Sequence, residues 1–312
     1  MAGWLAAFQM SDNSSSFSKP LGDVNILELF FFGKKPDSSL FSCDPLGDGK
    51  SLLELIHVAP NNVTNLDSFI CNAARVSFAN DNKIQKDDRA LIRYLLRKQH
   101  TSPFEMVEFY FVIKCPIFIA RQWIRHRTAS VNEESGRYII YRPEFYIPND
   151  KEEIKKQSKN NKQGRSDESV DDGVAEEYIN YITESYKETY EKYVYFTEKG
   201  IAKEIARNML PLAQYTRFMW KMDLHNLLNF IRLRTAPDAM LEIRKYAEAI
   251  QKVLKPLLPH TMEAFEDFQQ KSLTLTRLEL KSIADSKELS NATSREEVEW
   301  KEKKSLLEPK KN

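Results

Sequence analysis

The feature that most constrains this chain is segment 121–138, which carries four arginines, a histidine, two amides and two carboxylates within eighteen positions. Pro116 suits the first position of a helix, and apolar residues recur at helical spacing after it. In that helix Arg121 and Arg125 share a face, and Gln122 lies beside Arg125. A polar stretch closed by a Ser-Gly pair follows. Hydrogen-bond donors are therefore expected to converge where a helix ends.

An arginine-rich segment is most often a solvated helix face followed by a polar loop. That interpretation fits poorly here, because Trp123 and Ile124 indicate burial on at least one side. Guanidinium groups beside a buried surface need acceptors, and phosphate and carboxylate groups match their geometry. The segment therefore predicts a ligand with anionic groups.

The charge balance argues against a general attraction to polyanions. The 312 residues include 46 Lys and Arg against 45 Asp and Glu, so neither nucleic acid nor a membrane surface is an expected partner. The apolar runs fall far below the ~20 residues that a membrane-spanning helix requires. A soluble protein is expected, with any basic site confined to one place.

Cysteine usage predicts a reducing, cytoplasmic setting. Cys43, Cys71 and Cys115 are widely separated and have no CxxC spacing, so neither disulfides nor a metal site is expected. The first twenty residues contain one Lys and no Arg, which makes them a poor organelle-targeting sequence.

Hydrophobic periodicity predicts a mixture of helices and strands. Strands are expected at residues 52–58, 107–113 and 138–146, and helices at 68–75, 88–99, 178–199, 201–209, 220–233 and 238–254.

Three sequence blocks occur in the order typical of one protein family. His-Thr-Ser-Pro-Phe-Glu stands at 100–105, Arg-His-Arg at 125–127 with Asn-Glu and Ser-Gly-Arg-Tyr following at 132–133 and 135–138, and Asn-Phe-Ile-Arg-Leu-Arg at 229–234. These blocks resemble the motifs of the flavin-dependent thymidylate synthases, and the resemblance covers roughly residues 51–268.

The resemblance implies one α+β domain, with a mixed β-sheet flanked by helices, at residues 51–268. Residues 1–50 are then an N-terminal extension that is partly disordered, and residues 269–312 are a charged C-terminal tail. Within the domain, residues 149–177 lack aromatic side chains and are dense in Lys, Asp, Glu, Asn and Gln. This composition predicts a disordered insertion.

The activity implied by the resemblance is reductive methylation of dUMP to dTMP. Methylenetetrahydrofolate would donate the carbon, bound FAD would relay hydride, and NADPH would reduce the flavin. The family assembles as homotetramers, with active sites between subunits. FAD carries a pyrophosphate and dUMP a monophosphate, so two anionic ligands would account for the many donors.

The resemblance also assigns residues to the two ligands. Asp223 and His225 stand where some family members have Asn-x-Arg, so this turn departs from the pattern. Arg234 would have the catalytic role of stabilising negative charge on the uracil ring. The FAD set is Ser77, His100, Arg125, His126, Arg127, Glu133, Asp223, His225 and Asn229, and the dUMP set is Gln122, Arg125, Glu133, Ser135, Gly136, Arg137, Arg207 and Arg234.

Two other functions compete with this assignment. A thymidylate synthase of the cysteine-dependent type would need a thiolate beside a histidine, and Cys115 is the candidate nearest the motif. It has no histidine nearby in sequence, which favours a core role. An RNA-binding module built on the arginine helix is the second alternative, against which the neutral overall charge argues.

Overall fold

The computed structural model describes residues 40–77, 87–159 and 164–307, and its centre is a five-stranded antiparallel sheet in the order β1-β2-β3-β7-β4. The central strands β3 and β7 pair along their whole length, from Glu108 opposite Asp223 to Pro116 opposite Tyr215. The strands are β1 (Phe41–Cys43), β2 (Leu52–Ala59), β3 (Glu108–Pro116), β4 (Ser130–Glu133) and β7 (Tyr215–Asp223).

The two central strands explain why the sheet has one buried face. Phe109, Phe111 and Ile113 alternate along β3 and are fully buried, and Phe218 and Trp220 do the same on β7. Side chains two residues apart in a strand point to the same face. That face must therefore be covered, and helices cover it.

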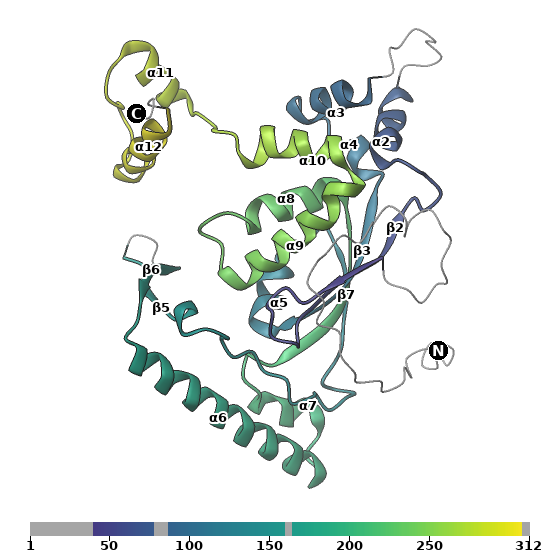
Figure 1. Cartoon of the computed structure of the whole chain (residues 1–312), viewed down its shortest axis with the longest axis vertical. Helices are drawn as coiled ribbons and strands as arrows, with labels where there is room; N and C mark the ends of the chain where they lie inside the picture. Colours follow the sequence, from purple (N-terminus) through teal and green to yellow (C-terminus); the bar gives the residue numbers. More distant parts are fainter. Residues whose placement is uncertain (1–39, 78–86, 160–163, 308–312) are drawn as a thin grey trace.

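The helices group around the sheet in three places (Figure 1). Those over the buried face are α5 (Ile117–Trp123), α8 (Leu224–Arg234) and α9 (Leu241–Leu257). At one end lie α2 (Leu66–Arg75), α3 (Asp88–Arg97), α4 (Ser102–Glu105), α10 (Pro259–Phe265) and the π-helical turn η4 (Glu266–Gln270). At the other end lie α6 (Asp172–Glu198), α7 (Lys203–Ala206) and the short 3-10 helix η3 (Arg207–Met209), while α11 (Arg277–Asp285) and α12 (Ser294–Leu307) stand apart from the body.

The α+β prediction is confirmed, but two predicted elements are wrong. The helix expected at 220–233 begins only at Leu224, because residues 215–223 form β7. The strand expected at 138–146 is an irregular segment with a single bridge, between Phe145 and Gln214. Contacts with α6 hold this segment in place of strand pairing: Phe145 packs against Tyr186 and Tyr190, and Tyr190 Oη donates to the Tyr141 carbonyl at 2.8 Å.

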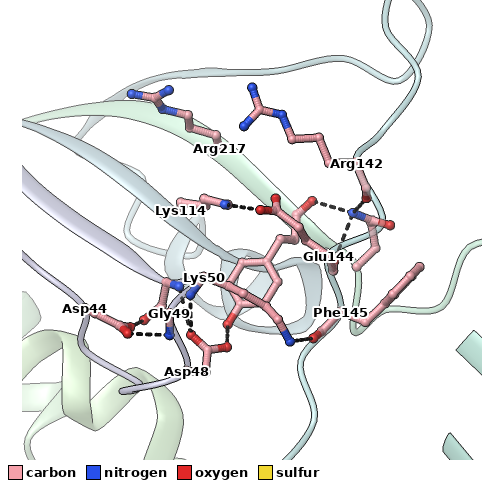
Figure 2. Close-up of polar contacts among 12 residues, drawn as sticks. Asp44, Asp48, Gly49, Lys50, Lys114, Arg142, Glu144, Phe145 and Arg217 are labelled. Atoms are coloured by element: carbon pink, nitrogen blue, oxygen red, sulfur yellow. Dashed lines mark hydrogen bonds and ion pairs between the residues drawn. The ribbon is translucent and has the colours of Figure 1, made fainter. Parts of the chain in front are cut away.

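The expected N-terminal extension at 1–50 is described only from residue 40: Phe41–Cys43 form β1, residues 44–50 connect it to β2, and residues 1–39 lie outside the described part. Figure 2 shows how this segment is attached. The Asp48 carboxylate accepts a hydrogen bond from Tyr215 Oη on β7, and Lys50 Nζ donates to the Phe145 carbonyl at 3.0 Å. Beside them, Lys114 of β3 pairs with Glu144 at 2.7 Å.

The segment 149–177 also departs from expectation. It contains the 3-10 helix η2 (Lys151–Glu153), the antiparallel strands β5 (Lys155–Gln157) and β6 (Arg165–Ser169), and the start of α6. Residues 160–163 lie outside the described part. Ion pairs order this polar segment, as the Arg165 pair with Glu242 of α9 illustrates, and composition alone does not reveal them.

Among the described residues, no helix is both long and apolar enough to cross a membrane.

Trp123, the last residue of α5, is the centre of the aromatic core. Its ring is fully buried, 5.2 Å from Trp220 and 5.0 Å from Phe230 between centroids, and it also contacts Phe218 and Tyr246. The end of α5 is thereby fixed to β7, α8 and α9 at once.

Replacing this side chain should remove much of the stability of the domain. We expect Trp123→Ala to lower the free energy of unfolding by about 3–5 kcal/mol, because the cavity it leaves is bounded by rigid aromatic rings. Urea unfolding followed by circular dichroism measures the loss. Trp300→Ala, in the outlying α12, is the matched control and should leave the main transition in place. Equal losses in the two variants would contradict the central role of Trp123.

Candidate functional site

The arginine-rich segment forms the junction between α5 and β4. Helix α5 ends at Trp123, and residues 125–129 form a loop that leads into the edge strand at Ser130. Burial of Trp123 fixes the start of this loop, so its polar side chains emerge beside the end of α8. The expectation that donors converge where a helix ends is confirmed.

A large cavity of about 1420 Å³ opens on one side of this junction. Gln122, Arg125 and Arg234 line it together, so three of the predicted nucleotide-binding residues share one space. Its other walls come from the start of α9 and from the β5–β6 hairpin.

A second cavity of about 630 Å³ adjoins the first, because Arg125, Leu233 and Arg234 line both. The flavin candidates His126, Arg127 and Asn229 lie here, together with Arg125. Asn226 and Thr128 complete the lining, and the sequence analysis did not identify them. Asn226 lies three residues before Asn229 on the same helix face, which is a signal that could have found it.

A hydrogen bond connects Arg234, which lines both cavities, to His126, which lines the second. Arg234 Nε donates to His126 Nε2 at 3.0 Å, and Arg234 Nη2 donates to the Gln122 carbonyl at 3.1 Å. Burial, with the Arg234 guanidinium beside it, lowers the pKa of His126 to about 4. The imidazole is therefore neutral near pH 7, and its free nitrogen lone pair orients the guanidinium.

Arg125 and Arg127 differ from Arg234 in having no ion-pair or side-chain hydrogen-bond partner within the described part of the chain. Both are exposed, and both line the second cavity with the Asn226 and Asn229 amides. Guanidinium and amide donors together suit the oxygens of a pyrophosphate. This donor set fits the flavin dinucleotide that the sequence led us to expect.

A second group of residues predicted to bind the nucleotide lies beyond β4. Gly136 N donates to Tyr141 Oη at 3.3 Å, and a side chain at position 136 would collide with Tyr141 and crowd Arg207. Glycine is required by this close approach. Arg137 pairs with Glu204 at 3.4 Å on an exposed surface. Ser135, Gly136, Arg137 and Arg207 do not line either cavity of this chain.

The remaining candidates lie outside both cavities. Glu133 is on β4 and accepts a hydrogen bond from Thr216 Oγ1 at 2.6 Å. Asp223 caps α8 by accepting from Asn226 N at 3.0 Å, and His225 is in the following turn. Ser77 follows α2, and His100 follows α3 with its ring edge-on to Tyr94; both are exposed.

The cysteines are poor nucleophile candidates. Cys115 is fully buried in the core, and burial raises the pKa of its thiol well above the ordinary value. Burial also raises the pKa of Cys43 to about 11 and that of Cys71 to about 12. A thiolate is therefore disfavoured at each position.

Known proteins are similar in sequence to most of this chain. The family model described as "Thymidylate synthase complementing protein" matches residues 60–260. A flavin-dependent thymidylate synthase of Dictyostelium discoideum is 47% identical over 243 residues, which cover 78% of this chain and 79% of that protein. A protein of the same name from Thermus thermophilus is 49% identical over 217 residues, 70% of this chain and 78% of its own.

A solved structure agrees with the sequence matches. The UMP/dUMP methylase PolB from Streptomyces cacaoi, bound with 5-Br UMP, has a TM-score of 0.62 and 32% identity, covering 70% of this chain and 94% of that one. The extent of the family match and the identity to these relatives establish that this chain belongs to the flavin-dependent thymidylate synthase family.

Proposed function

We propose that this protein converts dUMP to dTMP, with methylenetetrahydrofolate as carbon donor, FAD as hydride relay and NADPH as reductant. The observation that carries the proposal is the pair of adjoining cavities that share Arg125 and Arg234. One holds the flavin candidates, and the other holds nucleotide candidates. We also propose a cytoplasmic location, which the three free cysteines support.

The smaller cavity is our candidate for the flavin. Arg125, Arg127 and Asn229 would hold its pyrophosphate through charge-assisted and amide hydrogen bonds, and His126 would border it. When bound, the flavin supplies reversible hydride transfer between reductant and substrate. The assignments of Ser77, His100, Asp223 and His225 to FAD remain proposals that rest on the family resemblance.

The residues expected to bind dUMP form two groups that lie in different places on one chain. Gln122, Arg125 and Arg234 face the larger cavity, whereas Arg137 and Arg207 lie beyond β4 with Ser135 and Gly136. A second copy of the chain would bring its own Arg137 group to this cavity. We therefore propose a homotetramer whose active sites form between subunits, with Glu133 between the two ligands.

Arg234 is our candidate catalytic residue. Its guanidinium, oriented by neutral His126, would face the uracil ring and stabilise the negative charge that develops as carbon 5 becomes nucleophilic. This electrostatic role needs no covalent attack by the protein, in agreement with the buried state of Cys115.

The direct test is activity of the purified protein. We expect it to carry releasable FAD and to form dTMP from dUMP, methylenetetrahydrofolate and NADPH. Arg127→Ala should lose flavin on dilution, because it removes an unpartnered donor from the smaller cavity. Arg295→Ala, on the exposed α12, is the control and should retain it. A flavin-loaded protein that forms no dTMP would refute the proposed reaction.

Loss of the arginines proposed to bind the phosphate should weaken the binding of dUMP and leave the binding of its unphosphorylated analogue, deoxyuridine, nearly unchanged. We expect Arg137→Ala and Arg207→Ala to reduce dUMP affinity roughly ten- to a hundredfold, since a charge-assisted hydrogen bond contributes about 1.5–3 kcal/mol. Deoxyuridine binding should change little, and so should NADPH oxidation. Glu204→Ala is the matched control: it removes the partner of Arg137 and keeps the cation.

The same variants test whether sites form between chains. Co-expressed Arg137→Ala and Arg234→Ala subunits should recover part of the activity that each lacks alone. An equal loss of affinity for dUMP and deoxyuridine, or no recovery on mixing, would refute this arrangement.

The neutral state of His126 should appear in the pH dependence of stability. Its folded pKa, about 4, lies below the ordinary value of 6.5, so its contribution is complete above about pH 6.5 and is lost as the pH falls toward 4. We expect urea unfolding to show wild type losing on the order of 1 kcal/mol more than His126→Gln between pH 7 and pH 5, after discounting for partial exposure. Equal losses in both proteins would contradict a neutral, hydrogen-bonded His126.

A further inference from the structure

The β5–β6 hairpin forms an outer wall of the larger cavity. Six of its residues line that space, opposite the face that carries Gln122, Arg125 and Arg234. In Figure 1 the hairpin lies beside the joined ends of α8 and α9, at the start of α6. The hairpin residues of the lining are Lys155, Gln157, Gly164, Arg165, Ser166 and Asp167.

An ion pair fastens this wall to α9. Arg165 Nη2 donates to both carboxylate oxygens of Glu242, at 2.5 and 2.7 Å. The Glu242 side chain is only 5% exposed, and its carboxylate also accepts a hydrogen bond from Tyr146 Oη at 3.1 Å. A second ion pair joins Lys245 of α9 to Glu153 of η2, just before the hairpin, at 2.6 Å.

The residue that holds the hairpin is adjacent in sequence to residues that line the larger cavity. Glu242 is in the first turn of α9, directly after Met240 and Leu241, which line the cavity. Met240 Sδ accepts a hydrogen bond from Gln122 Nε2 at 3.4 Å. The carboxylate that holds the hairpin is therefore two residues from the Met240 contact with Gln122.

The dimensions of the cavity show what the wall contributes. At about 1420 Å³ it exceeds the 300–1,000 Å³ of ordinary ligand pockets even with the hairpin in place. Without the hairpin, the face formed by α5, α8 and α9 would open to solvent on that side. This chain would then enclose a bound nucleotide from one side only.

We propose that Arg165 and Glu242 are positioning residues that hold the β5–β6 hairpin as a wall confining dUMP against Gln122, Arg125 and Arg234. This inference rests on the proposed function of the cavity. Neither residue touches the reacting atoms; both act through the placement of the wall. Their loss should weaken nucleotide binding more than turnover.

The test compares Arg165→Ala, Arg165→Lys and the double variant Arg165→Ala with Glu242→Gln. We expect KM for dUMP to rise about tenfold in Arg165→Ala and in the double variant, with kcat within about threefold and flavin content unchanged. Arg165→Lys should restore part of the affinity, since it keeps the charge. The double variant leaves no uncompensated buried carboxylate, so it carries the test if Arg165→Ala does not fold.

Lys156→Ala is the matched control, because Lys156 is in the same hairpin, pairs with exposed Glu168 and does not line the cavity. Its KM should match wild type. Limited trypsin digestion measures release of the hairpin, and cleavage near Lys155 should accelerate in the Arg165→Ala variants. An unchanged KM in a folded variant, with or without faster cleavage, overturns the proposal, as does a fall in kcat alone. If wild type forms no dTMP, the proposed function fails, and the digestion experiment alone then tests whether the ion pair holds the hairpin. Equal cleavage rates in wild type and Arg165→Ala would overturn that role, and faster cleavage of Arg165→Ala would support it.

Discussion

The structure depends on the burial of Trp123 among Phe218, Trp220, Phe230 and Tyr246. This contact joins the end of the arginine-bearing helix to the strand and the two helices that complete the cavities. The aromatic core fixes the backbone at the start of the loop at 125–129, whose Arg125 and Arg127 have no ion-pair partner among the described residues. A backbone fixed in this way reduces the conformational freedom that is lost when an anionic ligand binds.

The division of donors between two places on one chain has a thermodynamic consequence. In the proposed site formed by two copies, ligand binding would be tied to association, because each chain would supply only part of the donors. The total charge is nearly neutral, with 46 Lys and Arg against 45 Asp and Glu, which does not favour a broad basic surface. The RNA-binding alternative requires such a surface, and the family membership of the chain gives it no support.

Much of this organisation could be predicted from the sequence, because strong local signals produced it. Hydrophobic periodicity predicted both β3 and α3, with the period-two alternation around Phe109 indicating the strand. The helix-end position of the arginines predicted the junction that both cavities share. The signals failed where tertiary contacts replaced local pairing: Tyr141 and Phe145 looked like strand residues, yet their burial comes from packing against α6. Strand β7 was merged with α8 because no breaker separates the two elements, whose boundary is the Asp223 cap.

The hairpin illustrates a limit of composition as a guide to order. A segment without aromatic residues cannot bury enough apolar surface to fold by itself, so its sequence predicts disorder. Arg165 nonetheless meets Glu242, 77 positions away, because the fold brings a nearly buried carboxylate to the surface that the hairpin crosses. An unpaired carboxylate there would be costly, and the cation that relieves the cost also fixes the segment that carries it. Order in this polar segment therefore originates in the helix that it contacts, and the same contact completes the wall of the cavity.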